Sequence, residues 1–156
     1  MVKTNVMRIL DRAKVAYNTY EYKSDGAIAG TEVAKAIGKR EECVFKTLVT
    51  VGKSGANYVF VIPVAEELDL KKAAASVGEK SIEMLKSKNL LPTTGYVHGG
   101  CSPIGMKKQF VTTVHFTAEN EETIVFSAGK IGAQVEMSLE TLKSLVPLTT
   151  ADVIVE

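Results

Sequence analysis

Apolar residues recur at helical spacing in the first segment of the chain. Thr4 or Asn5 can cap a helix there, because the side-chain oxygen of either residue can accept a hydrogen bond from a free N–H of the first turn. The apolar positions that follow share one face: Val6, Ile9, Leu10 and Ala13. The chain therefore opens with an amphipathic helix.

Four further segments carry helix signals, in most cases a capping residue in front or a glycine behind. They are residues 32–37 after Thr31 and before Gly38, 70–77 after Asp69 and before Gly78, 81–86, and the segment from Ser138 through Leu145. The last of these is amphipathic. Each is short, so each needs a sheet or another helix to pack against.

Between these helices, β-branched and aromatic residues cluster in short runs typical of strands. The runs are 17–22, 43–51, 57–64, 95–98, 111–116, 123–126 and 133–136. A Gly-Lys-Ser-Gly turn at 52–55 separates the second run from the third and predicts a hairpin. Because strands and helices interleave without a linker, we expect one α+β domain over residues 1–156, with helices packed on a curved, mainly antiparallel sheet.

Lys46 lies inside the apolar strand at 43–51. An ammonium group in such a setting is costly unless it finds anionic or carbonyl partners. Its side chain therefore either lines a cleft or extends along its own four-carbon stem to the surface. The strand pattern leaves both readings open.

Two glycine-rich turns are the other unusual features. The first spans residues 95–105, where four glycines and a proline allow close backbone approach to a ligand or, alternatively, form a bulged turn at a sheet corner. The second spans 126–132. Neither this turn nor the one at 52–55 has the spacing of a nucleotide-binding P-loop.

Composition and charge narrow the function classes. The chain is 46% hydrophobic and 24% charged, has no Trp and carries a net charge of +1, so net charge alone does not propose a nucleic-acid binder. Lys71, Lys72, Lys107, Lys108 and Lys130 are candidate phosphate contacts or solvated surface residues. Two cysteines suit a reducing compartment, and without a signal sequence or an apolar run near ~18 residues we expect a cytoplasmic protein that does not bind membranes.

No protein nucleophile or metal site is apparent in the sequence. His98 and Cys101 offer two metal ligands without a third or fourth at suitable spacing, so we expect no metal. Cys101 is either a nucleophile with His98 or His115 as base, or a small buried thiol. The serines lack a nucleophile elbow. We also expect no cofactor.

Taken in order, the motifs resemble the YbaK/EbsC-like aminoacyl-tRNA deacylases, relatives of the editing domain inserted in bacterial prolyl-tRNA synthetases. The resemblance covers nearly the whole chain. It rests on Lys3-Thr-Asn-x-x-x-x-Leu10, Val44-Phe-Lys-Thr-Leu48, Leu68-Asp-Leu-Lys-Lys-Ala73, Thr94-Gly-Tyr-Val-x-Gly-Gly100, Ser102-Pro-Ile-Gly105, Lys107-Lys108 and Ser127-Ala-Gly-Lys-x-Gly132. Two departures bear on which amino acid is accepted: this chain has Glu21-Tyr-Lys-Ser-Asp25 where many relatives carry His and acidic residues, and Ala128-Gly129 where others have Gly-Gly.

The resemblance implies a sheet closing towards a barrel and a cleft for the aminoacylated 3′ CCA end of tRNA. By motif, the implied catalytic residues are Lys46, Gly100 and Ser102. The implied substrate contacts are Tyr20, Thr47, Cys101, Ser127, Gly129 and Lys130. Lys46 would hold either the adenosine end with its phosphates or the ester oxygens, and backbone N–H groups at 99–102 would receive the oxyanion.

The resemblance also implies trans-editing of mischarged tRNA. In cysteine-specific members the substrate's own thiol attacks its ester, which suits a chain without a nucleophile, and the loop at 99–105 favours Cys-tRNA(Pro). Two alternatives stay open: an Ala-tRNA(Pro) hydrolase that uses water, and a non-catalytic module that binds nucleotide or tRNA. The protein either associates with prolyl-tRNA synthetase or acts alone on released tRNA, as a monomer or weak dimer.

Overall fold

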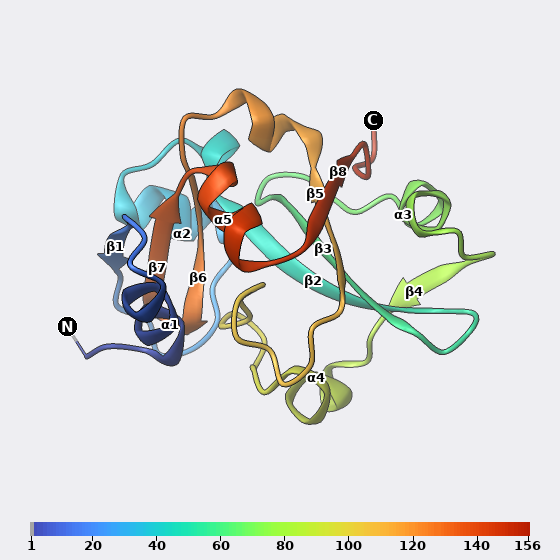
Figure 1. Cartoon of the computed structure of the whole chain (residues 1–156), viewed down its shortest axis with the longest axis horizontal. Helices are drawn as coiled ribbons and strands as arrows, with labels where there is room; N and C mark the ends of the chain where they lie inside the picture. Colours follow the sequence, from blue (N-terminus) through green and yellow to red (C-terminus); the bar gives the residue numbers. More distant parts are fainter. Residues whose placement is uncertain (1) are drawn as a thin grey trace.

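The computed structural model describes residues 2–156, which form two sheets and five α-helices (Figure 1). The elements in chain order are α1 (Asn5–Ala13), β1 (Asn18–Glu21), α2 (Gly30–Ile37), η1 (Glu41–Cys43), β2 (Phe45–Gly52), β3 (Asn57–Pro63), α3 (Leu70–Val77), β4 (Ile82–Met84), α4 (Ser87–Thr94), β5 (Val111–His115), η2 (Phe116–Asn120), β6 (Ile124–Lys130), β7 (Ala133–Met137), α5 (Leu139–Leu145) and β8 (Leu148–Ala151). The expected α+β class is confirmed.

The strands divide between two sheets. One has the order β1-β7-β6 and is antiparallel throughout. The other has the order β4-β2-β3-β5-β8, with antiparallel pairs around β2 and parallel pairs at β3/β5 and β5/β8. Antiparallel pairing therefore predominates, as predicted. The sheets do not join into a closed barrel within residues 2–156, so the expected closure is not confirmed.

The first helix and the third are capped as the sequence predicts. The Thr4 hydroxyl accepts a hydrogen bond from the N–H of Met7, and Asp69 accepts from Lys71 and Lys72. Gly78 ends α3 in the left-handed conformation, which glycine adopts without steric cost. The second helix begins at Gly30, two residues earlier than its predicted cap Thr31 requires, and has no side-chain cap.

Two predicted elements were wrong, and two others were missed. Residues 81–86 are not helical: Ile82–Met84 form β4, because they pair with the end of β2 at Thr50–Gly52. Residues 95–98 are not a strand: Gly95 ends α4 in the left-handed conformation, and the irregular segment after it leads into a turn closed by the Gly100 N–H on the Val97 carbonyl. The sequence prediction missed α4 and the edge strand β8.

The main hydrophobic core lies between the two sheets and under α1. It joins Phe45 and Val61 of the larger sheet to Phe126 of the smaller sheet and to Leu10 of α1. A smaller cluster packs α2 on the other face of the smaller sheet, around Ala34 and Val125. In Figure 1 the smaller sheet accordingly stands between α1 and α2, and the long β2/β3 hairpin runs away from it. Within residues 2–156, every helix is too short or too polar to cross a bilayer.

Candidate functional site

A cavity of about 430 Å³ opens where the start of β2, in the larger sheet, lies beside β6 of the smaller sheet. Its walls come from the start of α2 with the preceding loop, from the first half of β2, from the segment around α4, and from the glycine-rich loop at 98–101. Most of the lining side chains are apolar, and none of those described is an aspartate or glutamate. The cavity is therefore small and mostly apolar, and residues 2–156 bring no carboxylate to its lining.

Lys46 lines this cavity, which decides between the two readings of its sequence position. The side chain is half-buried and makes no hydrogen bond or ion pair with residues 2–156. Burial lowers the pKa of Lys46, and the more distant Glu67 and Glu66 oppose that shift. A partly desolvated, unpaired ammonium is suited to an anionic ligand.

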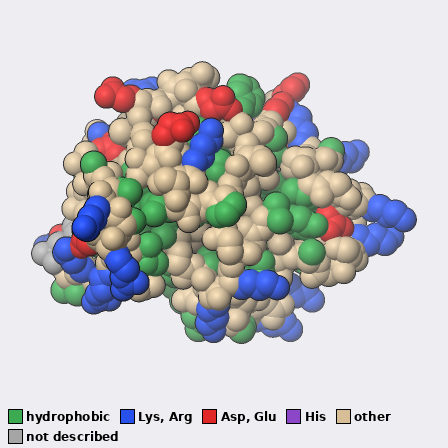
Figure 2. Space-filling model, viewed as in Figure 1, with side chains coloured by type: hydrophobic (Ala, Val, Ile, Leu, Met, Phe, Trp, Pro, Cys, Tyr) green, Lys and Arg blue, Asp and Glu red, His purple; other side chains and the backbone are tan. Residues whose placement is uncertain are grey.

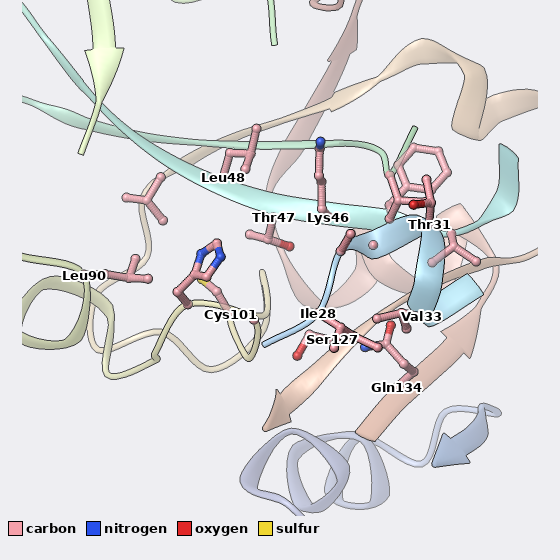
Figure 3. Close-up of a pocket in the computed structure, with 18 of the residues that line it drawn as sticks. Ile28, Thr31, Val33, Lys46, Thr47, Leu48, Leu90, Cys101, Ser127 and Gln134 are labelled. Atoms are coloured by element: carbon pink, nitrogen blue, oxygen red, sulfur yellow. The ribbon is translucent and has the colours of Figure 1, made fainter. Parts of the chain in front are cut away.

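The Lys46 amine and the Thr47 hydroxyl leave β2 in opposite directions (Figure 3). This follows from the alternation of side chains along a strand. Thr47 points to the same side as Cys101, whereas the ammonium points away from Cys101 and Ser127. Lys46 therefore lies on a different wall from the polar groups of the cavity floor.

Thr47 also presents unpaired backbone groups. The carbonyl of Val44 accepts from Val64 and the N–H of Gly52 donates to Ala56, so even-numbered residues of β2 bond to β3. The backbone N–H and C=O groups of odd-numbered residues point to the other edge of β2, where the Val49 carbonyl accepts a hydrogen bond from the Leu85 N–H. Because β4 pairs only with Thr50–Gly52 and the bridge to β6 is at Val44, no strand within residues 2–156 pairs with Thr47 on this edge.

The Thr47 hydroxyl is buried and has no hydrogen-bond partner within residues 2–156. Such a group is costly in a folded protein unless a ligand or water completes it. Together with the open peptide edge, it makes Thr47 a point at which a polar ligand group would gain hydrogen bonds.

The two glycine-rich turns lie against each other. A Cβ atom at Gly100 would lie 3.1 Å from the Ile131 nitrogen and 3.3 Å from the Lys130 Cα. Gly100 itself donates its N–H to the Val97 carbonyl at 3.0 Å, so this donor is not free for a substrate. The neighbouring N–H groups of Gly99 and Cys101 have no acceptor within residues 2–156, and both residues line the cavity.

Cys101 is a buried thiol and not an activated nucleophile. Burial raises the pKa of Cys101 to about 12, despite a hydrogen bond with Thr94. A thiol must ionise to attack a carbonyl. His115 is buried on β5, where its Nδ1 accepts from the Val153 N–H at 3.3 Å, and it does not line the cavity. His98 is exposed and does line the cavity.

Ser127 and Gln134 form the opposite wall. They are directly paired across β6 and β7, so their side chains share a face. The Ser127 oxygen accepts from Gly129 N–H at 3.1 Å. The Gln134 amide makes no hydrogen bond with residues 2–156 and is turned towards Ile28 and Val33 (Figure 3). Sequence reasoning missed Gln134, although a glutamine between strand residues that read as buried was a usable signal.

Three predicted residues shape the turns without lining the cavity. The fully buried Ser102 accepts from Ile104 N–H at 3.3 Å and so stabilises its own turn. Gly129 has φ +91° and would meet the Tyr96 ring if it carried a side chain. Gly100 lies between the two turns, as described above.

The remaining two predicted contacts lie outside the cavity. The Tyr20 hydroxyl donates to Glu136 at 2.9 Å, and the Lys39 amine sits 5.2 Å from the centre of the Tyr20 ring. Lys130 is exposed beside a separate shallow surface depression. The cavity thus brings together Lys46, Thr47, Cys101 and Ser127, and it leaves Tyr20 and Lys130 apart.

Glu136 is the centre of a buried polar cluster beside this wall, on the same face of β7 as Gln134. Burial raises its pKa, but hydrogen bonds from Asn18, Lys39, Tyr20 and Thr123 outweigh that effect and hold the pKa at about 2. All these groups are satisfied, so the cluster joins β1, β7 and the chain after α2 and positions the cavity wall. Among residues 2–156, no three histidine, cysteine or acidic side chains gather as metal ligands would.

Known proteins share this sequence and fold. Residues 27–145 match the model of the aminoacyl-tRNA editing domain. An Enterococcus faecalis protein provisionally named Cys-tRNA(Pro)/Cys-tRNA(Cys) deacylase EbsC is 48% identical over 144 residues, which cover 92% of this chain and 88% of that protein.

Two solved structures share the fold of this chain. A protein described as a candidate trans-editing enzyme for prolyl-tRNA synthetase superposes with a TM-score of 0.85 at 22% identity, covering 99% of this chain and 100% of that one. A scaffold protein used for epitope backbone grafting gives 0.86 at 22% identity, covering 97% and 95%. The motif resemblance is confirmed, and the chain belongs to the aminoacyl-tRNA editing domain family.

Proposed function

We propose that this chain deacylates mischarged tRNA, and that its substrate is Cys-tRNA(Pro). The observation that carries the proposal is a cavity without a usable protein nucleophile. It holds no carboxylate among the described residues, and the pKa of its one thiol, Cys101, is raised to about 12. The 48% identical relative bears a Cys-tRNA deacylase name, in agreement with this reading.

A substrate cysteine supplies the missing nucleophile. Its sulfur attacks its own ester carbonyl, a C–S bond forms, and the C–O bond to the terminal ribose breaks. The thiol proton ends on the released ribose hydroxyl, and the cyclic thioester is then hydrolysed by water. The protein needs only to hold the folded-back geometry and to stabilise the developing oxyanion.

The free N–H groups at Gly99 and Cys101 are our candidates for the oxyanion donors. One preorganised donor of this kind is worth about 3–4 kcal/mol. The Thr47 peptide edge and hydroxyl, with Gln134 and Ser127 opposite, would bind the amino group and the ribose. The apolar walls at Val49 and Leu90 suit a small side chain.

Lys46 takes the phosphate of the terminal adenosine in this proposal. The sequence left two ligands open for the Lys46 ammonium, the adenosine end with its phosphates or the ester oxygens. The ammonium leaves β2 on the side away from Thr47 and Cys101, which favours the phosphate. Thr47 and the loop at 99–101 would then be left to contact the ester.

His98 supports a second candidate, hydrolysis of Ala-tRNA(Pro) by water. Alanine has no thiol, so a general base would have to activate the water, and His98 is the exposed imidazole at the cavity. His98→Gln separates the two. Cys-tRNA(Pro) deacylation survives this change if the thiol acts, whereas a water mechanism loses roughly 100-fold or more.

The direct experiment follows ester loss from Cys-, Ala- and Pro-tRNA(Pro) with and without the protein. We expect acceleration for Cys-tRNA(Pro) and little for Pro-tRNA(Pro). A binding module without activity would slow spontaneous hydrolysis of all three. Repeating the assay with prolyl-tRNA synthetase tests the proposed partner, since a complex would lower KM for the same tRNA.

A further inference from the structure

Charge is unevenly distributed along this nearly neutral chain. Between Met84 and Ala118 there are four lysines and no aspartate or glutamate. That segment carries +4 and the rest of the chain −3, because the whole carries +1. A near-zero net charge therefore hides one strongly basic segment.

The four lysines lie at the two ends of one helix. Lys86 is the residue before α4, and Lys88 is in its first turn. Lys107 donates its backbone N–H to Thr94 at the end of α4, its side-chain stem runs over Gly95, and Lys108 follows. We call Lys86, Lys88, Lys107 and Lys108 the α4 ridge.

All four lysines of the α4 ridge are exposed, and none forms an ion pair with residues 2–156. Figure 2 shows basic side chains along the lower edge of the molecule, over α4, while most acidic side chains visible in that view lie along the upper edge. The ridge is thus a positive surface without internal neutralisation.

The α4 ridge is continuous with the cavity. Leu85, Ser87 and Leu90 line the cavity and alternate with the ridge lysines 86 and 88. Leu91 and Val97 are also exposed beside the ridge, at 52% and 48%. A chain that enters the cavity therefore passes this surface.

We propose that the α4 ridge binds the phosphates of the tRNA acceptor end while the aminoacylated terminus occupies the cavity. This inference rests on the proposed function and adds the surface that holds the rest of the substrate. The helix is on the order of 12 Å long, enough to meet several phosphates. Exposed leucine and valine side chains beside the lysines can contact sugars, which an acidic protein partner would not require.

The test uses three double variants that each remove two positive charges. Lys86→Gln/Lys88→Gln and Lys107→Gln/Lys108→Gln change the ridge. Lys14→Gln/Lys71→Gln is the control, with Lys14 directly after α1 and Lys71 on α3. Binding of a tRNA with an amide-linked amino acid is measured by fluorescence anisotropy across salt concentrations. Deacylation of aminoacyl-tRNA and of 3′-O-cysteinyl adenosine, which has no phosphate, is measured in parallel.

Each ridge variant should weaken tRNA binding by roughly tenfold and lower the slope of log K against log salt by about 1 per lysine. Its rate on the adenosine ester should be unchanged, and the control should match the unaltered protein. Equal loss in the control, no loss in either ridge variant, or equal loss on the adenosine ester would overturn the proposal. Inactivity on every ester would refute the proposed function. The binding measurement would still show whether the α4 ridge binds tRNA.

Discussion

Gly100 packs directly on the backbone of Lys130, so close that a Cβ at residue 100 would lie 3.3 Å from the Lys130 Cα. This contact holds the loop that carries Gly99 and Cys101 against the turn that follows Ser127. Two motifs almost thirty residues apart in sequence therefore form one wall of the cavity. The wall depends on backbone proximity, which a Cβ atom at this position would disturb.

Gly100→Ala should damage the cavity more than the fold. The added methyl must push the two turns apart by a few tenths of an ångström, which costs about 1–2 kcal/mol of unfolding free energy. We expect kcat/KM for Cys-tRNA(Pro) to fall at least tenfold while circular dichroism stays native. Gly26→Ala, which has open space around its Cα, is the matched control and should leave both values unchanged.

Thr47→Val should lower activity without lowering stability. The hydroxyl is buried without a partner, so its removal leaves no group unpaired and the unfolding free energy should stay within about 1 kcal/mol or rise. If the hydroxyl binds the substrate, KM should increase several-fold. Unchanged kinetics, measured beside chemical denaturation, would remove Thr47 from the substrate contacts.

Lys46→Met should abolish deacylation and leave the protein at least as stable. Methionine keeps most of the apolar stem, and the charge that burial disfavours is gone. Lys46→Arg should also be poor, because a planar fork does not replace a compact ammonium. Lys35→Met, an exposed lysine on α2, serves as control. Full activity in Lys46→Met would contradict the role given to this residue.

Glu136→Gln should cost on the order of 3 kcal/mol at neutral pH, because the carboxylate has a pKa of about 2 in the folded state against 4.5 as its ordinary value. A lowered pKa stabilises the fold above pH 4.5, and this contribution is lost as the pH falls towards 2. The stability difference between the variant and the unaltered protein should therefore shrink over that window. Exposed Glu122→Gln should show no such convergence in acid denaturation.

Local sequence signals predicted the elements that local chemistry decides. The β2/β3 hairpin follows from its turn, and the ends of α3 follow from Asp69 and Gly78. Long-range pairing decided the rest. Ile82–Met84 became a strand because the edge of β2 was available, and β8 exists only through parallel pairing with β5. Pro92 is unfavourable inside a helix, so the sequence did not predict α4, although Ser87–Thr94 are helical.

The site was predictable in part for the same reason. Lys46 stood out because a charge in an apolar strand needs an explanation, and the structure places it in the cavity. Gln134 did not stand out, since its position opposite Ser127 depends on the register of β6 and β7. Tyr20 shares that sheet but turns to Glu136, a contact between residues 116 positions apart that no local pattern indicates.

The most direct measurement compares ester loss from Cys-tRNA(Pro) and from the same tRNA charged with 2-aminobutyrate. In 2-aminobutyrate a methyl group replaces the sulfhydryl, which keeps the side chain close to the size of cysteine and removes the attacking thiol. The account predicts rapid protein-dependent deacylation of the first and only the spontaneous rate for the second. Equal acceleration of both would show that water or a protein group attacks the ester, and it would contradict the substrate-thiol mechanism.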